Sequence, residues 1–265
     1  MGAIHRVNLP KNPQLWFVAS DWHSFHLHLA SYEILIKHAL SLPFKPSLVI
    51  NGDFFDFAFL MPKNPFYKMW IDRKDGVEEF FLPEYEKEIK WGNEKLDELQ
   101  CVFENIIFVM GNHDNPRVDQ FKETCPEMYK PHFDLVNSLG LEKRKIGWCL
   151  YNDWVDMGNI SLTHGQAHGP SAKKKHWEKS GGRSVIFGHV HTAECQTFAS
   201  RGNTTAVWSL PSMADLNPHY IKNSEVSWQN GYGTLYIKPN GNFNFHTHLI
   251  FDDELLLPNG QIIKA

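Results

Sequence analysis

The feature that most constrains this chain is a repeated succession of a short apolar run and a polar cluster directly after it. Runs rich in Val, Ile, Leu and Phe are typical of buried strands, and the first three are Leu15–Ser20, Ser47–Asn51 and Asn105–Met110. In α/β proteins ligands bind beyond the carboxyl ends of strands, so such clusters can meet in one crevice although they lie far apart in the sequence. The succession therefore predicts an α/β sheet with a binding site along one edge.

Further apolar runs follow, and the last third of the chain is predicted to consist of strands joined by turns. These runs are Asn159–Thr163, Ser184–Gly188, Thr204–Ser209, Tyr232–Ile237 and Asn242–Phe251. Helical periodicity covers Phe25–Leu42 and the stretch after Asp114. Because polar clusters from both halves must face one crevice, we expect an α/β fold of two packed mixed β-sheets flanked by helices, a four-layer αββα sandwich.

The 265 residues contain no Pro/Gly/Ser-rich linker or change of composition, so a single domain over 1–265 is expected. The segment 57–100 interrupts the order of strands with an aromatic loop and then an amphipathic helix from roughly Pro83. It begins soon after Asp53, which predicts an insert near the active site that forms a wall or lid. Near the end of the chain, His246 and His248 alternate with Phe243 and Phe245, which places both histidines on the solvated side of a sheet.

Five polar clusters follow predicted strands. Seven of their side chains offer two carboxylates, one amide oxygen and four imidazoles: Asp21, Asp53, Asn112, His23, His164, His189 and His191. The clusters are Asp21-Trp22-His23, Gly52-Asp53, Gly111-Asn112-His113-Asp114, Thr163-His164-Gly165 and Gly188-His189-Val190-His191. Each of these motifs alone occurs by chance in many chains. As a set, the donors suit two borderline divalent ions, whereas Mg²⁺ would prefer oxygen ligands throughout.

The ordered set D-x-H, G-D-x-x-D, G-N-H-D, H-G and G-H-x-H resembles that of the calcineurin-like metallophosphoesterase superfamily, from Asp21 to His191. The resemblance implies a centre of two divalent metal ions, with Mn²⁺ expected first and Fe, Zn or Ni as the alternatives. One ion would take Asp21, His23, Asp53 and His191, and the other Asp53, Asn112, His164 and His189. The carboxylate of Asp53 would then bridge the two ions.

The resemblance also implies the roles of three residues beside the metals. His113 would protonate the leaving oxygen or stabilise the transition state, and Asp114 would hold its other ring nitrogen. Asp56, which completes G-D-x-x-D, is expected to accept hydrogen bonds and not to bind metal. The predicted reaction is hydrolysis of a phosphoester by a hydroxide that bridges the metals.

Several substrates and one non-catalytic function remain open at this stage. A phosphodiesterase acting on a nucleotide or nucleic acid is favoured over a phosphomonoesterase or protein phosphatase. The alternative from a different class is a non-catalytic scaffold of the same fold, as in one retromer subunit. That alternative would be favoured by the loss of His113 or of metal ligands, and this sequence retains them all.

Charge and cysteine content limit the partners that the chain can have. The 26 basic and 30 acidic residues give a net charge of −4, so no global positive field attracts nucleic acid or anionic membrane. A nucleic acid would need a local track, and Lys173–Lys175 with Arg183 is the candidate, its alternative being a solvated helix start. The four cysteines are scattered and form no C-x-x-C pair, and the sequence shows no secretory signal or membrane span. We therefore expect a cytoplasmic protein.

Overall fold

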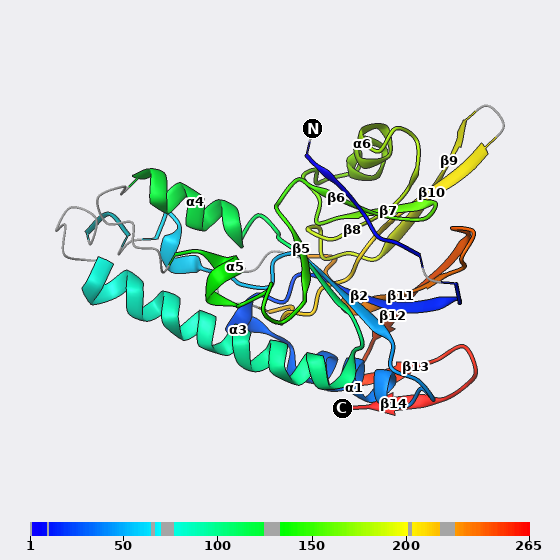
Figure 1. Cartoon of the computed structure of the whole chain (residues 1–265), viewed down its shortest axis with the longest axis horizontal. Coiled ribbons are helices and arrows are strands. Elements are labelled where there is room, and N and C mark those ends of the chain that lie inside the picture. Colours follow the sequence, from blue (N-terminus) through cyan, green and yellow to red (C-terminus); the bar gives the residue numbers. More distant parts are fainter. Residues whose placement is uncertain are drawn as a thin grey trace.

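Two mixed β-sheets pack face to face with helices on their outer faces in this computed structural model (Figure 1). The structure describes residues 2–9, 11–64, 67–69, 77–124, 133–200, 203–217 and 226–265. This architecture is the expected four-layer sandwich, and the two sheets draw strands from both halves of the chain.

The first sheet has the strand order β12-β11-β2-β3-β4-β5. Its strands are β2 (Gln14–Ala19), β3 (Ser47–Asn51), β4 (Ile106–Val109), β5 (Gly147–Cys149), β11 (Asn230–Ile237) and β12 (Phe243–Ile250). Strands β2 to β5 run parallel, whereas β11 pairs antiparallel with both β2 and β12. The parallel strands therefore end at the same edge.

The second sheet has the order β1-β6-β7-β8-β10-β9. Its strands are β1 (Ile4–Arg6), β6 (Trp154–Met157), β7 (Ile160–Thr163), β8 (Ser184–Phe187), β9 (Glu194–Ser200) and β10 (Asn203–Ser209). Strands β7, β8 and β10 are parallel neighbours. A separate pair is formed by β13 (Glu254–Leu256) and β14 (Ile262–Lys264).

The helices are α1 (Leu29–Leu40), α3 (Leu82–Val102), α4 (Asn115–Thr124), α5 (Leu135–Ser138) and α6 (Ala172–Lys179), with single turns η1 (Ser24–His26), η2 (Ala58–Leu60) and η3 (Val77–Phe81). The predicted helix over Phe25–Leu42 is shorter than expected, since η1 precedes α1. The prediction lacks the short strands β1, β5, β6, β13 and β14 and also the seven-residue strand β9.

Successive side chains of a strand point to opposite faces of its sheet, and this alternation divides the core into separate layers. On β2, Phe17 faces the cluster that contains the helix residues Ile34 of α1 and Leu96 of α3. Val18, the next residue, faces the second sheet and joins Ile186 of β8 in the cluster between the sheets. A third cluster packs α6 against the outer face of the second sheet. Because successive side chains point to opposite faces, a sheet buried on both sides reads as the continuous apolar runs seen in the sequence.

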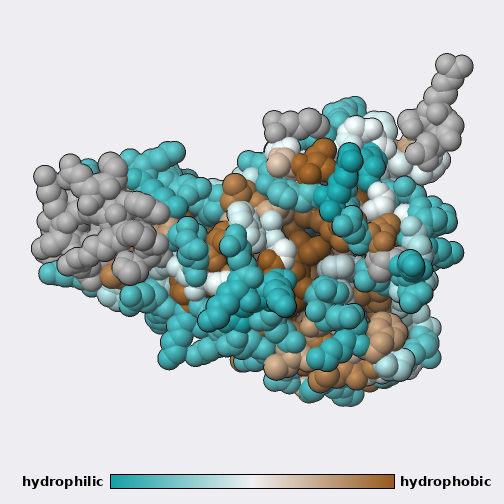
Figure 2. All heavy atoms as spheres, viewed as in Figure 1, coloured by the Kyte–Doolittle hydropathy of each residue, from teal (hydrophilic) through white to brown (hydrophobic). Residues whose placement is uncertain are grey.

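Helix α3 belongs to the packed layer next to the first sheet. Its Tyr85, Leu96 and Leu99 are buried in the same cluster as the sheet residues. At Gly92 an added Cβ would overlap the ring of Phe55, so the helix approaches the loop after β3 as closely as its backbone allows. Figure 2 shows hydrophilic side chains over the outer side of this helix. The helical part of the predicted insert is therefore part of the core, and residues 65–66 and 70–76 lie outside the described residues.

The prediction for His248 is wrong. Its side chain is buried at 7% exposure, and its Nε2 lies 2.7 Å from Thr234 Oγ1, whereas His246 is exposed as expected. The alternation holds at the start of β12, but the later part of the strand packs His248 against His38 of α1. Burial lowers the pKa of His248 to about 4.

Candidate metal centre

All seven predicted metal ligands lie in loops that follow the carboxyl ends of strands. Asp21 and His23 follow β2, Asp53 follows β3, Asn112 follows β4, His164 follows β7, and His189 and His191 follow β8. Backbone hydrogen bonds join the first two of these loops, with the amide of Asp21 donating to Gly52 O at 3.0 Å. The two sheets thus bring residues separated by most of the chain to one place.

The first predicted ligand set is assembled around Asp21. The ligand atoms of Asp21, His23 and His191 all lie within 4.8 Å of one another. His191 Nε2 is 3.1 Å from Asp21 Oδ1 and 3.4 Å from His23 Nε2. All three residues are buried. Burial would raise the pKa of Asp21, but the neighbouring His191 and His164 rings hold that pKa well below its usual value.

The second predicted set is assembled around Asp53. The ligand atoms of Asp53, His164 and His189 also lie within 4.8 Å of one another, and Asn112 Oδ1 is 3.0 Å from His164 Nε2. A third group of the same kind joins Asp53 to His23 and His113. The Asp53 carboxylate therefore stands between the two sets, as a bridging ligand must.

Hydrogen-bond directions test whether these donors fit a cation. His164 Nδ1 lies 2.9 Å from the carbonyl oxygen of Asn51, which can only accept, so Nδ1 carries the proton. In a neutral ring His164 Nε2 then presents a lone pair, 3.2 Å from Asp53 Oδ2. Acceptors that face each other at this distance require a positive charge between them or an extra proton. The ring and its neighbours fit a divalent metal ion.

The same argument applies to His23 in the first set. Its Nδ1 lies 3.2 Å from Asp56 Oδ1, which places the proton on Nδ1 and leaves the lone pair on Nε2. That lone pair points to His191 Nε2. Two borderline cations would satisfy both sets with imidazole, carboxylate and amide donors.

The backbone of the site is held in an uncommon conformation. Five of the predicted ligands have positive φ: Asp21 at 59°, His23 at 52°, Asp53 at 49°, His189 at 71° and His191 at 56°. Residues other than glycine rarely adopt this region, at a cost of about 1–3 kcal/mol each. Backbone strain of this kind clusters at functional sites, and here it turns the side chains at the strand ends toward one point.

Glycines in the motifs permit the close approach of the ligand loops. A Cβ added at Gly52, which has a φ of +89°, would overlap the ring of His164. A Cβ added at Gly111 would overlap the carboxylate and amide of Asp53. The glycine of G-D and the first glycine of G-N-H-D are thus required by packing against the ligands themselves.

His113 lies beside the two sets, and its partners differ from those expected. His113 Nδ1 is 3.0 Å from Asp56 Oδ1, and the His113 amide donates to Asp53 Oδ1 at 2.8 Å. The Asp114 carboxylate instead accepts from the amides of Gly111 at 2.6 Å and Phe55 at 2.9 Å. The prediction that Asp114 holds the His113 ring is therefore wrong, because the turn after β4 directs Asp114 onto the backbone of both loops.

Asp56 and Asp114 are both buried, but their surroundings shift the pKa values of the two carboxyl groups in opposite directions. Burial would raise the pKa of Asp56, and the hydrogen bonds from His113 and His23 hold it well below the usual value. Burial and the nearby Asp53 raise the pKa of Asp114 to about 6. Asp56 is thus an ionised acceptor for two histidine rings, which is the role expected of it.

Two residues of this network were not predicted. Arg117 on α4 places Nη2 2.9 Å from His113 Nε2 and donates through Nη1 to the backbone oxygen of Asp56. Glu88 on α3, 6% exposed, accepts from the Ser24 hydroxyl and from the amide of Phe57 at 3.1 Å. The one available signal for Arg117 is its position one helical turn after His113.

The predicted basic cluster is largely neutralised. Lys173 forms an ion pair with Glu194, and Lys174 lies 3.8 Å from Glu178. Arg183 donates to Ser161 Oγ at 2.9 Å and to a backbone oxygen. These contacts favour the solvated helix start over a track for a nucleic acid backbone.

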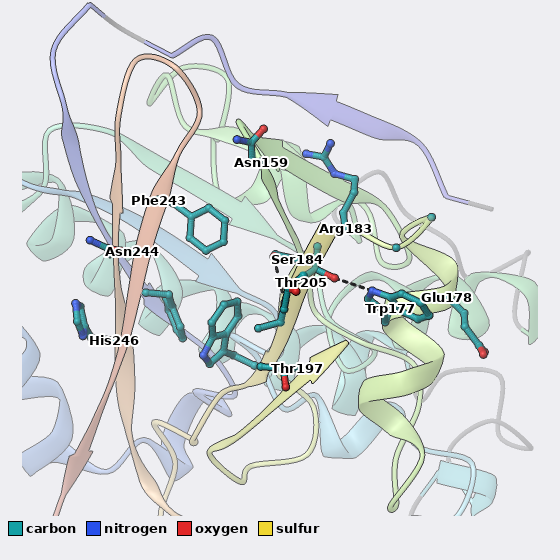
Figure 3. A pocket seen from close by; sticks show the side chains of 16 residues that line it. Asn159, Trp177, Glu178, Arg183, Ser184, Thr197, Thr205, Phe243, Asn244 and His246 are labelled. Carbon is teal, nitrogen blue, oxygen red and sulfur yellow. Dashed lines mark hydrogen bonds between the residues drawn. The ribbon is translucent and has the colours of Figure 1, made fainter. Parts of the chain in front are cut away.

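A large cavity lies away from the metal centre. It has a volume of about 1070 Å³, and Figure 3 shows Trp177 and Glu178 of α6 on one side and Phe243, Asn244 and His246 of β12 on the other. Trp177 Nε1 donates to Thr205 Oγ1 at 2.8 Å across one wall. None of the predicted ligands lines this cavity.

Within the described ranges, no helix is both long and apolar enough to cross a membrane.

Comparison with known proteins places these motifs in context. Residues 17–193 match the family model described as calcineurin-like phosphoesterase. Similar solved structures include a single mutant of Vps29 from Entamoeba histolytica, with 13% identity, a TM-score of 0.48, and 95% of this chain and 98% of that chain covered. Vps29 from Chaetomium thermophilum has 13% identity, a TM-score of 0.47, and coverage of 95% and 93%. A 5'-nucleotidase from Candida albicans has 10% identity, a TM-score of 0.36, and coverage of 92% and 53%. No curated protein sequence matched this chain.

Proposed function

Because the chain belongs to the calcineurin-like phosphoesterase family, we propose that it is a two-metal phosphodiesterase acting on a nucleotide. The observation that supports this most is the convergence of the predicted ligands in two sets, one around Asp21 and one around Asp53, with Asp53 also close to His23 of the first set. A non-catalytic scaffold is less well supported, because every predicted ligand is present and turned inward. A long nucleic acid strand is less well supported, because Lys173 and Lys174 of the basic cluster are paired with Glu194 and Glu178.

The ligands would hold two divalent ions, for which we propose Mn²⁺ first. When bound, such ions lower the pKa of a water between them and offset the negative charge that develops on the phosphoryl oxygens. The chain supplies the positions: Asp53 lies between both sets, and Asn51 O and Asp56 fix the proton on Nδ1 of His164 and His23. Both rings are thereby presented as lone-pair donors before a metal arrives.

His113 and Arg117 make the side of the site where we place the leaving group. Arg117 can only donate, so its bond to His113 Nε2 leaves the proton of a neutral His113 on Nδ1, facing Asp56. A substrate oxygen that enters here would meet the guanidinium first, and the ring once Arg117 turns toward the phosphate. The guanidinium would thus offset charge on the leaving oxygen. Once Arg117 has turned away, His113 Nε2 would be free to take up a second proton from solvent, and the ring would deliver that proton to the leaving oxygen.

The test is metal-dependent hydrolysis of matched esters. Protein stripped with a chelator is reloaded with Mn²⁺, Fe²⁺, Zn²⁺ or Ni²⁺ and assayed with bis-p-nitrophenyl phosphate and p-nitrophenyl phosphate. We expect about two ions per chain and a higher kcat/KM for the diester, both lost in Asp53→Ala and retained in the surface control Asp119→Ala. Two bound ions without hydrolysis of either ester would support the scaffold, and a preference for the monoester would support a phosphomonoesterase.

A further inference from the structure

A second cavity adjoins the metal centre on the side of His189. It has a volume of about 590 Å³, within the range of small-molecule sites, and His189 itself lines it. Trp228 forms part of its wall and packs on His191, with ring centroids 4.4 Å apart. The cavity is therefore lined by His189 of one ligand set and reaches His191 of the other through Trp228, so a phosphoester held at the metals would have its adjoining group beside this space.

The lining combines flat rings with polar groups at the rim. Rings of Trp228, His168, Phe187 and His189 line the cavity, and the His168 ring centroid lies 6.3 Å from that of His189. The Thr192 hydroxyl, the Ser227 hydroxyl and the Lys173–Glu194 ion pair supply donors and acceptors. A planar base attached to a hydroxylated sugar matches this combination, because the base can stack on an aromatic ring while the sugar meets polar groups.

The cavity is distinct from the side that carries the proton donor. His113 contacts His23, Asp53, Asp56 and Arg117, and neither His113 nor Arg117 lines the cavity. A diester has two groups on its phosphorus, one that leaves and one that stays. With the leaving group beside His113, the cavity is available to the group that stays.

We infer that this cavity, walled by Trp228 and His168, is the subsite for the nucleoside that remains on the phosphate, with Trp228 as the stacking platform. This inference rests on the proposed function, since it assigns the retained half of the same substrate. It predicts specificity for a nucleoside at that position with tolerance of different leaving groups.

The kinetic test varies the retained group while the leaving group stays constant. Thymidine 5'-(p-nitrophenyl phosphate) is compared with methyl p-nitrophenyl phosphate in the parent, Trp228→Ala, Trp228→Phe and the exposed-ring control Tyr236→Ala. In Trp228→Ala the ratio of kcat/KM for the nucleoside ester to that for the methyl ester should fall about 5- to 150-fold, the range for one lost base–aromatic stack. Trp228→Phe should restore most of the ratio, and Tyr236→Ala should leave it at the parental value.

A binding measurement tests the subsite without turnover. Calorimetry on chelator-treated protein compares thymidine 5'-monophosphate with inorganic phosphate. The nucleotide should bind more tightly to the parent, and Trp228→Ala should remove most of that difference. Equal affinity for both in the parent, or an unchanged ratio of kcat/KM in Trp228→Ala, would overturn the subsite while leaving the phosphodiesterase intact. Failure of the parent to hydrolyse any ester would instead overturn the proposed function.

Discussion

Acid should destabilise this protein through two histidines buried behind the first sheet. His38 of α1 and His248 of β12 are each 7% exposed, with ring centroids 5.4 Å apart. The Tyr232 hydroxyl lies 2.7 Å from His38 Nδ1, and Thr234 Oγ1 lies 2.7 Å from His248 Nε2. Burial lowers the pKa of each ring to about 4, and for His248 the charges of His38 and His246 act in the same direction. Both rings are therefore neutral in the folded protein at pH 7.

The size of the effect comes from the difference in pKa between the folded and unfolded states. The value falls from 6.5 to about 4 on folding, so the unfolded chain binds more protons between those pH values. The contribution of these two neutral rings to the free energy of unfolding is complete above pH 6.5 and is lost as the pH falls toward 4. At 1.36 kcal/mol per pKa unit, each ring accounts for about 3 kcal/mol and the pair for about 6 kcal/mol. That is comparable to the net stability of a typical domain, about 5–15 kcal/mol.

The assay is urea unfolding from pH 7.5 to pH 4.5 in the presence of a chelator. The double variant His38→Asn, His248→Gln places amide groups near the bonded ring nitrogens and does not titrate. As the pH is lowered, the free energy of unfolding of this variant should fall less than that of the parent. The two decreases should differ by several kcal/mol at pH 4.5. The control His5→Gln removes an exposed histidine and should follow the parent. Parallel curves for the parent and the double variant would refute the reasoning.

Four substitutions test the site. Asp53→Ala should release at least one ion and abolish hydrolysis, as elemental analysis and the diester assay will show. His113→Ala should keep about two ions per chain while kcat falls about 10²–10⁴-fold, and loss of metal would assign His113 to the ligands instead. Arg117→Ala should lower kcat/KM for the diester about 10²-fold, with partial recovery in Arg117→Lys. Glu88→Ala should lower the free energy of unfolding by about 3 kcal/mol, because it leaves the Ser24 hydroxyl and the Phe57 amide without their acceptor, whereas Glu88→Gln should lie within about 1 kcal/mol of the parent in urea unfolding.

The sequence predicts the layers and the ligand sets because both depend on local pattern. Ser47–Asn51 is predicted with its observed bounds, since a strand buried on both faces is an uninterrupted apolar run. The clusters at strand ends then meet because parallel strands end at one edge. Short strands such as Gly147–Cys149 are missed because three residues carry too little pattern.

The remaining parts of the site depend on contacts that no local pattern encodes. Glu88 lies on the buried stripe of α3, three positions after Tyr85, but its partners are in a loop 32 positions earlier in the chain. Arg117 meets Asp56 across 61 positions. The partner of His113 is wrong for the same reason, because the direction of Asp114 is set by the turn and by the amides that it caps.

The left-handed backbone at five metal ligands has a consequence for how such a fold could change over generations. Glycine would relieve the strain at Asp21, His23, Asp53, His189 and His191. At about 1 kcal/mol each, the relief sums to about 5 kcal/mol, a large part of the stability of an ordinary domain. A descendant protein that kept the fold but no longer used these side chains would gain thermal stability from substitution by glycine at these positions. In a chain that keeps aspartate and histidine there, substitution by glycine would raise stability. Those side chains are therefore retained only where the protein uses them.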